Sequence, residues 1–149
     1  MLIETKYHGE ITIDENEIIK FQNGLPGFIT EKKFILLPLD KESPFSILQS
    51  IVTTELGFVV VNPFYIKKDY EFVLTDGEKE TLQITNVEDI VVLTIMTVKD
   101  SLKNSTANLQ APIIINHKKR LGKQVILNNP KYSVRYPLYA ELEKNKDVR

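Results

Sequence analysis

Short runs of apolar residues, some of which alternate with polar residues, cover most of the chain and predict β-strands rather than helices. The runs are rich in β-branched and aromatic residues and end at Gly, Pro, Asn or Asp, as strands commonly do. They cover residues 2–7, 10–13, 17–21, 33–39, 45–52, 57–62, 70–74, 90–98, 112–116, 123–127 and 133–136. The run 90–98 is the most apolar and predicts a central strand buried on both faces, whereas Pro38 requires a strand end or a sheet edge.

Helical signals are few. Residues 75–82 begin with cap-type residues and predict a helix of about two turns, and residues 86–89 predict one capped turn. Residues 99–109 are polar and fit either a loop or a short helix. Because strands do not alternate regularly with helices, we expect a mainly β fold. Its expected form is a small, β-barrel-like folded antiparallel or mixed sheet with one or two short helices.

Length and composition indicate one soluble domain. The 149 residues are 42% hydrophobic and 26% charged, which is ordinary for a globular protein. We expect a single domain over residues 1–140 and a charged tail, 141–149, that frays. The start of the chain lacks the pattern of a signal peptide, and no apolar run is long enough to cross a membrane. The expected location is therefore the cytoplasm, without membrane contact.

Charge is distributed unevenly along the chain. Residues 1–100 hold 9 Lys and Arg against 17 Asp and Glu, a net charge of −8. Residues 101–140 hold 7 Lys and Arg and no acid. If the fold keeps these segments apart, the protein has one acidic and one basic face.

A glycine-containing motif at residues 23–28 raises the question of a phosphate-binding loop. It reads Asn23, Gly24, Leu25, Pro26, Gly27 and Phe28. No Lys follows the second glycine as in a phosphate loop, and the three glycines of a dinucleotide fingerprint are absent. A structural corner explains the residues better, because glycine accepts positive φ and proline fixes its own φ. Leu25 and Phe28 are expected to anchor this corner in the core.

Nothing in the sequence specifies catalysis, a metal site or a cofactor. His8 and His117 lack the spacing of a metal-ligand pair, and no serine lies in a nucleophile elbow. The absence of Cys excludes disulfides, thiolate metal sites and a cysteine nucleophile. The chain is therefore expected to be a binding protein rather than an enzyme.

The basic segment 117–139 is open to two interpretations. It interleaves Tyr132, Tyr136 and Tyr139 with Lys131 and Arg135. Aromatic and cationic side chains on a β-barrel are typical of single-stranded RNA binding, which is the alternative function. Strand alternation, however, would place Tyr132, Val134 and Tyr136 together on one face of a strand, as a tyrosine-containing core face.

Amide side chains gather around residues 107–116. Asn108 and Gln110 flank Leu109, and Asn116 closes the next apolar run. Such amides either pin a neighbouring loop internally or pair with the edge strand of a partner.

Several segments in order resemble one protein family, the bacterial flagellar assembly factor FliW. The segments are residues 21–28, 44–50, 69–72, 107–116, 124–127 and 132–135. Their order and spacing match across about residues 2–139, nearly the whole chain. Ala107 is a small departure, since a β-branched residue is expected there.

The resemblance implies a function that composition does not reveal. FliW proteins are cytoplasmic, non-enzymatic and cofactor-free, and they form a small β-barrel-like domain with a minor helix. They bind newly made flagellin as a chaperone. They also bind the translational regulator CsrA, which lifts its repression of flagellin mRNA. No direct nucleic-acid contact is implied, and a monomer is expected.

Two surfaces follow as hypotheses from the resemblance. A CsrA-binding surface would use the acidic residues Asp69, Glu71, Asp76, Glu78 and Glu80, because an RNA-binding partner presents positive charge. A flagellin-binding surface would use Phe45, Leu48, Leu109, Gln110 and Pro112, because the amphipathic helices of flagellin need an apolar cover. The motif at residues 23–28, together with Asn108 and Asn116, is interpreted as a structural feature of the family.

Overall fold

The structure, a computed structural model, describes residues 1–138. Tyr139, residue 140 and the predicted tail 141–149 lie outside the described residues. The strands are β1 (Leu2–Glu4), β2 (Glu10–Thr12), β3 (Ile19–Lys20), β4 (Lys33–Pro38), β5 (Phe45–Ser50), β6 (Gly57–Val61), β7 (Ile90–Thr97), β8 (Thr106–Ala107), β9 (Ile113–Asn116), β10 (Leu121–Gln124) and β11 (Tyr136–Pro137). The helices are α1 (Pro63–Ile66) and α2 (Asp76–Thr81), with 3-10 turns η1 (Glu15–Glu17), η2 (Val87–Asp89) and η3 (Leu102–Asn104).

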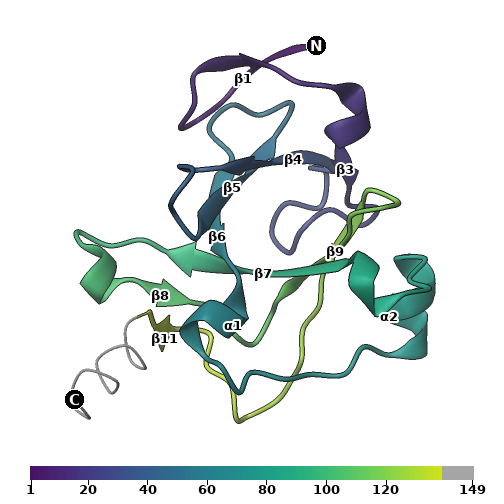
Figure 1. Ribbon diagram of the computed structural model, residues 1–149, viewed down its shortest axis with the longest axis vertical. Helices are drawn as coiled ribbons and strands as arrows, with labels where there is room; N and C mark the ends of the chain where they lie inside the picture. Colours follow the sequence, from purple (N-terminus) through teal and green to yellow (C-terminus); the bar gives the residue numbers. More distant parts are fainter. Residues whose placement is uncertain (139–149) are drawn as a thin grey trace.

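Seven strands close into a barrel. Their order is β7-β6-β5-β4-β3-β10-β9, and β9 pairs back onto β7 (Figure 1). All neighbours are antiparallel except β3 and β10, which run parallel and share one register pair, Lys20 with Leu121. β8 and β11 extend the sheet from β7, and β1 and β2 form a separate hairpin. The expected fold class, a mainly β barrel-like mixed sheet with short helices, is confirmed.

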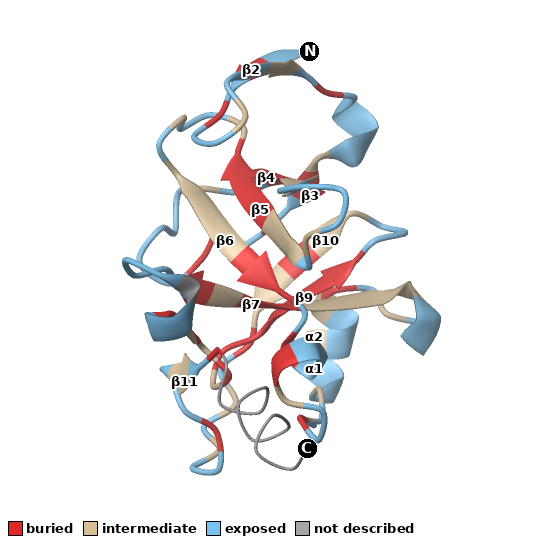
Figure 2. Cartoon of the chain, turned by 60° about the vertical axis from the view of Figure 1, so that its left-hand side comes forward, coloured by how far each residue is buried: buried red, intermediate tan, exposed pale blue. Residues whose placement is uncertain are grey.

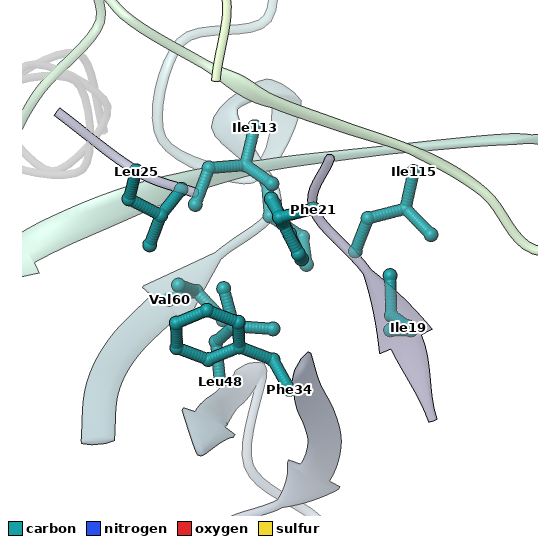
Figure 3. Packing of buried hydrophobic residues seen from close by; sticks show 9 residues of the cluster. Ile19, Phe21, Leu25, Phe34, Leu48, Val60, Ile113 and Ile115 are labelled. Atoms are coloured by element: carbon teal, nitrogen blue, oxygen red, sulfur yellow. The ribbon is translucent and has the colours of Figure 1, made fainter. Parts of the chain in front are cut away.

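The barrel interior is filled by apolar side chains from most of its strands (Figure 3). They are Ile19, Phe21, Leu25, Phe34, Leu48, Val60, Leu93, Ile113 and Ile115. The rings of Phe21 and Phe34 meet edge to face with centroids 5.2 Å apart. A Cβ built on Gly122 would lie 2.5 Å from the ring of Phe21, so β10 passes this ring at a distance that only glycine allows.

A second apolar layer covers the outside of the barrel. Buried Leu82, Ile114 and Val125 pack with half-buried side chains of residues 72–92 over the outer face of β7, β9 and β10. Figure 2 shows the buried positions concentrated on the barrel strands and the exposed ones on the turns and helices. Residues 70–84 are thus held against the barrel by this layer.

Several predicted elements are confirmed. β7 lies within the run 90–98, and β4 ends at Pro38, as the proline requires. α2 and η2 fall within the two predicted helical segments. Burial of β7 on both faces holds only for the neighbouring residues Leu93 and Thr94. Ile90, Val91, Val92 and Ile95 are partly exposed, and Thr97 is exposed.

Other predictions need correction. Residues 70–74 alternate in burial but have no strand partner, so they form no strand. The run 133–136 is replaced by the shorter β11, so Tyr132, Val134 and Tyr136 do not form the alternating face of one strand. Residues 99–109 contain η3 and then β8.

One strand begins earlier than predicted, and one short helix was not predicted. The predicted strand 123–127 begins two residues earlier, as β10, because its register follows the turn from β9. The sequence analysis missed α1, where the Asn62 side chain caps the helix and Pro63 occupies its first turn.

Candidate partner-binding surfaces

The motif at residues 23–28 is a corner built from two successive tight turns. The N–H of Gly24 donates to the carbonyl of Phe21 at 2.9 Å, and the N–H of Phe28 donates to that of Leu25 at 2.7 Å. Gly24 and Gly27 have φ of +64° and +85°, and Pro26-Gly27 fits the centre of a type II turn. Both N–H groups therefore donate to carbonyls within the corner rather than to a ligand, which supports the structural interpretation.

The two expected anchors of this corner behave differently. Leu25 is buried, as predicted. Phe28 is 41% exposed, so the expectation that it lies in the core is wrong. Its ring packs edge to face on that of Phe58, with centroids 5.6 Å apart, at the rim of the barrel.

The amide side chains pin loops internally. The Nδ2 of buried Asn116 donates to the carbonyls of Leu82 and Gln83 at 2.8 and 3.1 Å, which ties the end of α2 to the barrel. Gln110 donates to the carbonyls of Asn129 and Tyr132 and accepts from the N–H of Asn129. The Oδ1 of Asn108 accepts from the N–H of Gln110, which shapes the same loop. These hydrogen bonds support the interpretation of internal pinning.

The residues expected to bind flagellin do not form an exposed surface. Leu48 and Leu109 have no exposed area, and they belong to two different apolar clusters. Pro112 is also buried, and the Gln110 amide is fully engaged. Phe45 and Gln110 are the two residues of this set that are partly exposed. These positions therefore form no continuous exposed apolar face in the described residues, because Leu48 and Leu109 are each buried in a separate cluster.

The first two acidic candidates lie where the chain leaves α1. The carboxylate of Asp69 is 2.8 Å from the Nζ of Lys67, and this hydrogen-bonded pair lowers the pKa of Asp69 below its ordinary value. Glu71 is exposed, while its backbone N–H and C=O both bond to the hydroxyl of Tyr132.

The other three acidic candidates lie on α2. Asp76 and Glu80 are exposed, and Glu78 is half-buried because its carboxylate accepts from the N–H of Thr75 at 2.8 Å. Residues 69 and 76 are seven positions apart, so their Cα atoms lie at most roughly 25 Å from each other. All five residues belong to the stretch that runs from the end of α1 to the end of α2 (Figure 1).

The two tyrosines of the basic segment that the structure describes, Tyr132 and Tyr136, are not presented for stacking. Tyr132 is 4% exposed, and its ring lies 4.6 Å from that of Tyr70. The hydroxyl of Tyr70 donates to the carbonyl of Leu109 at 2.6 Å, and burial raises the pKa of Tyr70 well above its ordinary value. Tyr136 is half-buried beside Lys67. Within residues 1–138, the RNA-binding alternative therefore lacks the aromatic platform on which it depended.

An open groove of about 540 Å³ lies between β7 and residues 70–74. It is lined mainly by apolar side chains. These are Phe64, Tyr70, Phe72, Val73, Leu74, Val87, Ile90 and Val92, with Glu71 and Lys79 also contributing. Sequence reasoning missed the groove because it treated residues 70–74 as a paired strand.

Other buried polar residues were also missed. Gln49 has no exposed area, and its Nε2 donates to the carbonyls of Thr54 and Leu56 while its Oε1 accepts from the N–H of Lys6. A lone glutamine within the apolar run 45–52 was the available signal. Its role is to hold the turn between β5 and β6.

Two features are absent from the described residues. No group of three or more His, Cys, Asp or Glu side chains within residues 1–138 is arranged to hold a metal ion. In the same part of the chain, no helix has the length and apolar character needed to cross a membrane.

Comparisons with known proteins agree on one family. The family model for FliW protein matches residues 2–138. The flagellar assembly factor FliW of Bacillus subtilis (strain 168) is 47% identical over 141 residues, covering 95% of this chain and 99% of that protein. The protein of the same name from Geobacillus kaustophilus (strain HTA426) is 52% identical over 141 residues, covering 95% and 97%. A crystal structure of the flagellar assembly factor FliW is 51% identical with a TM-score of 0.88, covering 93% of this chain and 96% of that one.

Proposed function

The chain belongs to the FliW family of flagellar assembly factors, and from that premise we propose that it binds flagellin as a chaperone and binds the translational regulator CsrA. Binding of CsrA antagonises its repression of flagellin mRNA translation. Flagellin competes for the same molecules of this protein while it remains unexported. The matching family is one of assembly factors rather than of enzymes, which agrees with a role carried out by binding alone.

The observation that carries the CsrA part of the proposal is the exposed acidic segment. Asp69, Glu71, Asp76 and Glu80 are all exposed along residues 69–80. A regulator that binds RNA presents cationic side chains, to which this segment is electrostatically complementary. The same carboxylates repel phosphates, so bound protein opposes RNA without covering every RNA contact.

The role of Glu78 in this surface is limited by its role in the helix. Its carboxylate caps α2, so a charge reversal there alters folding and binding together. Glu71 and Glu80 are better positions for a test, because the hydrogen bonds between described residues involve neither side chain.

Calorimetry with purified CsrA and flagellin tests the proposal. The double variant Glu71→Lys and Glu80→Lys is expected to weaken CsrA binding about tenfold at low salt, with a smaller effect as salt rises. Its matched control reverses two exposed carboxylates in the turns flanking β5, Glu42→Lys and Glu55→Lys. Equal CsrA affinity for both double variants would reject the acidic surface.

The same titrations examine the partner switch. The unmodified protein is expected to bind both flagellin and CsrA. Its affinity for each of them should be at least as high as its affinity for a flagellin leader RNA. Flagellin added to the CsrA complex should displace CsrA. Binding to the RNA with neither protein partner would overturn the proposed function.

A further inference from the structure

We propose that the groove between β7 and residues 70–74 binds a partner by β-strand addition, and that its occupant is a basic, extended peptide segment with alternating apolar side chains. The added strand pairs with the backbone of Phe72–Leu74. The inference concerns the chemistry of the groove and does not depend on which protein carries the segment.

The first argument is that residues 70–75 already have the form of a strand. Burial alternates along them, with Tyr70, Phe72 and Leu74 facing the barrel and Glu71, Val73 and Thr75 exposed. A period of two is the signature of extended chain. Phe72 and Leu74 pack into the outer apolar layer, which fixes the position of this segment.

The second argument is that this strand-like segment has no partner. Among residues 1–138, no hydrogen bond involves the backbone N–H or C=O groups of Phe72, Val73 or Leu74. The segment is bounded by satisfied groups, at Glu71 through Tyr132 and at Thr75 through Glu78. A row of unpaired backbone donors and acceptors between two anchored ends is a template for another strand.

The third argument comes from the side chains beside this edge. Val73 is 86% exposed and Val87 is 84% exposed, and both line the groove. Phe64, 40% exposed, lines the same groove from α1. Alternate apolar side chains of an added strand find apolar neighbours there, which is how strand addition gains specificity.

The fourth argument is charge. Residues 69–89 hold seven acidic residues and a single Lys, a net charge of −6. The acids are Asp69, Glu71, Asp76, Glu78, Glu80, Glu88 and Asp89. An occupant with Lys or Arg between its apolar residues matches this field, whereas an acidic occupant, including a second copy of the groove, is repelled.

An extended occupant is favoured over a helix by the same backbone groups. A docked helix satisfies its own N–H and C=O groups and has none to offer to Phe72–Leu74. It would cover these groups without pairing them, which is unfavourable. An added strand instead forms a ladder of backbone hydrogen bonds with these groups.

Fluorescence polarisation with a labelled, end-blocked heptapeptide of alternating Lys and Val tests the proposal. The full chain is expected to bind it. Val73→Arg should weaken binding at least tenfold, because a long cationic side chain then stands in the groove. Val52→Arg is the matched control, since Val52 is 79% exposed in the turn after β5 and should change affinity less than twofold. Equal binding by both variants would overturn the proposal.

Two further probes examine strand pairing itself. A peptide N-methylated at every Val lacks the N–H donors along one edge of the strand, and a peptide N-methylated at every Lys lacks those along the other edge. At least one of the two should bind tenfold more weakly than the unmethylated peptide. Amide exchange at residues 72–74 should slow when the unmethylated peptide binds. Full binding by both methylated peptides, or tighter binding by an amphipathic helical peptide of equal charge, would reject strand addition. Neither flagellin nor CsrA is present, so failure here leaves the proposed function untouched.

Discussion

Gly24 and Gly27 lie in one corner but are constrained differently. A Cβ on Gly24 would lie 2.6 Å from the carbonyl oxygen of Phe28 and 2.7 Å from the backbone of Ile29. A Cβ on Gly27 would meet nothing within 4 Å, so only its positive φ constrains that position. Backbone is less able to move aside than a flexible side chain, so Gly24 is the more demanding site.

We therefore expect Gly24→Ala to lower the free energy of unfolding more than Gly27→Ala does. Left-handed backbone alone costs about 1–2 kcal/mol for an L-residue, which is the expected loss at Gly27. The clash at Gly24 adds to this and makes a total above roughly 3 kcal/mol. Urea unfolding of both variants measures the difference. Equal losses would show that the corner relaxes around a methyl group.

Tyr70 gives stability a dependence on alkaline pH. Burial, with a smaller contribution from nearby Tyr132, raises its pKa well above the ordinary value of 10.0. The unfolded chain therefore releases this proton first as pH rises. Above pH 10 the unfolded state binds fewer protons than the folded state, so the free energy of unfolding falls as pH increases.

Tyr70→Phe should remove this dependence. The variant loses the hydrogen bond to the carbonyl of Leu109 and should be about 0.5–1.5 kcal/mol less stable at pH 8. Above pH 10 its stability should fall less steeply than that of the unmodified protein, by at most about 1.4 kcal/mol per pH unit. Denaturant titrations at several pH values compare the two slopes. Parallel slopes would show that Tyr70 ionises normally in the folded protein.

At the level of elements, α2 depends on its cap. The hydroxyl of Thr75 accepts from the N–H of Glu78, and the carboxylate of Glu78 accepts from the N–H of Thr75. The helix is only six residues long, so its own hydrogen bonds are few. The cap and Leu82, buried in the outer layer, hold it in place.

Thr75→Ala should cost about 1 kcal/mol of unfolding free energy, because one capping acceptor is lost. Glu78→Gln keeps an acceptor for the N–H of Thr75 and should cost much less. Comparing the two variants thus separates the effect of the capping hydrogen bond from the effect of the charge. Glu78→Gln can then be used in CsrA titrations without disturbing α2. Thermal unfolding measures both variants. A larger loss for Glu78→Gln would mean that the charge, rather than the hydrogen bond, stabilises the helix.

The elements also show what sequence can and cannot predict here. The apolar runs 33–39 and 90–98 predict β4 and β7, because apolar patterning reports burial directly. Residues 70–74 also have a strand-like pattern but no paired neighbour, and pairing depends on where the chain returns. The sequence pattern thus predicts whether a segment is extended more readily than it predicts which strand pairs with that segment.

The candidate sites were less predictable than the fold. Exposure of Asp69, Glu71, Asp76 and Glu80 follows from their polar character. Burial of Leu48 and Leu109 depends on two clusters assembled from distant strands, which no local pattern specifies. The groove escaped prediction for the same reason, since its walls are separated by many residues in sequence.

For the molecule as a whole, the barrel is closed by a narrow seam. β3 has two residues, and it meets β10 through the pair Lys20 and Leu121. The N–H of Lys20 donates to the carbonyl of Arg120 at 2.9 Å. By contrast, β5 pairs over most of its length with both β4 and β6. Opening the barrel at the seam therefore breaks fewer contacts than opening it elsewhere.

We expect the amide of Lys20 to exchange with solvent faster than the amides of β5 under native conditions. Local opening at the seam needs less free energy than separation of the central strands. Hydrogen exchange followed by NMR compares these positions directly. Exchange at Lys20 as slow as at Ile47 would show that the barrel opens only by global unfolding.

The seam also sets when the chain can finish folding during its own synthesis. Lys20 and Leu121 are 101 positions apart, and at roughly 5–20 residues per second the ribosome needs about 5–20 seconds between them. Throughout that interval β4, β5 and β6 can pair as neighbouring hairpins. β3 can pair with β4 but not yet with β10, which has not been synthesised. The nascent chain is thus an open sheet until its last strands emerge, and a truncated translation product ending before β10 would retain that open edge.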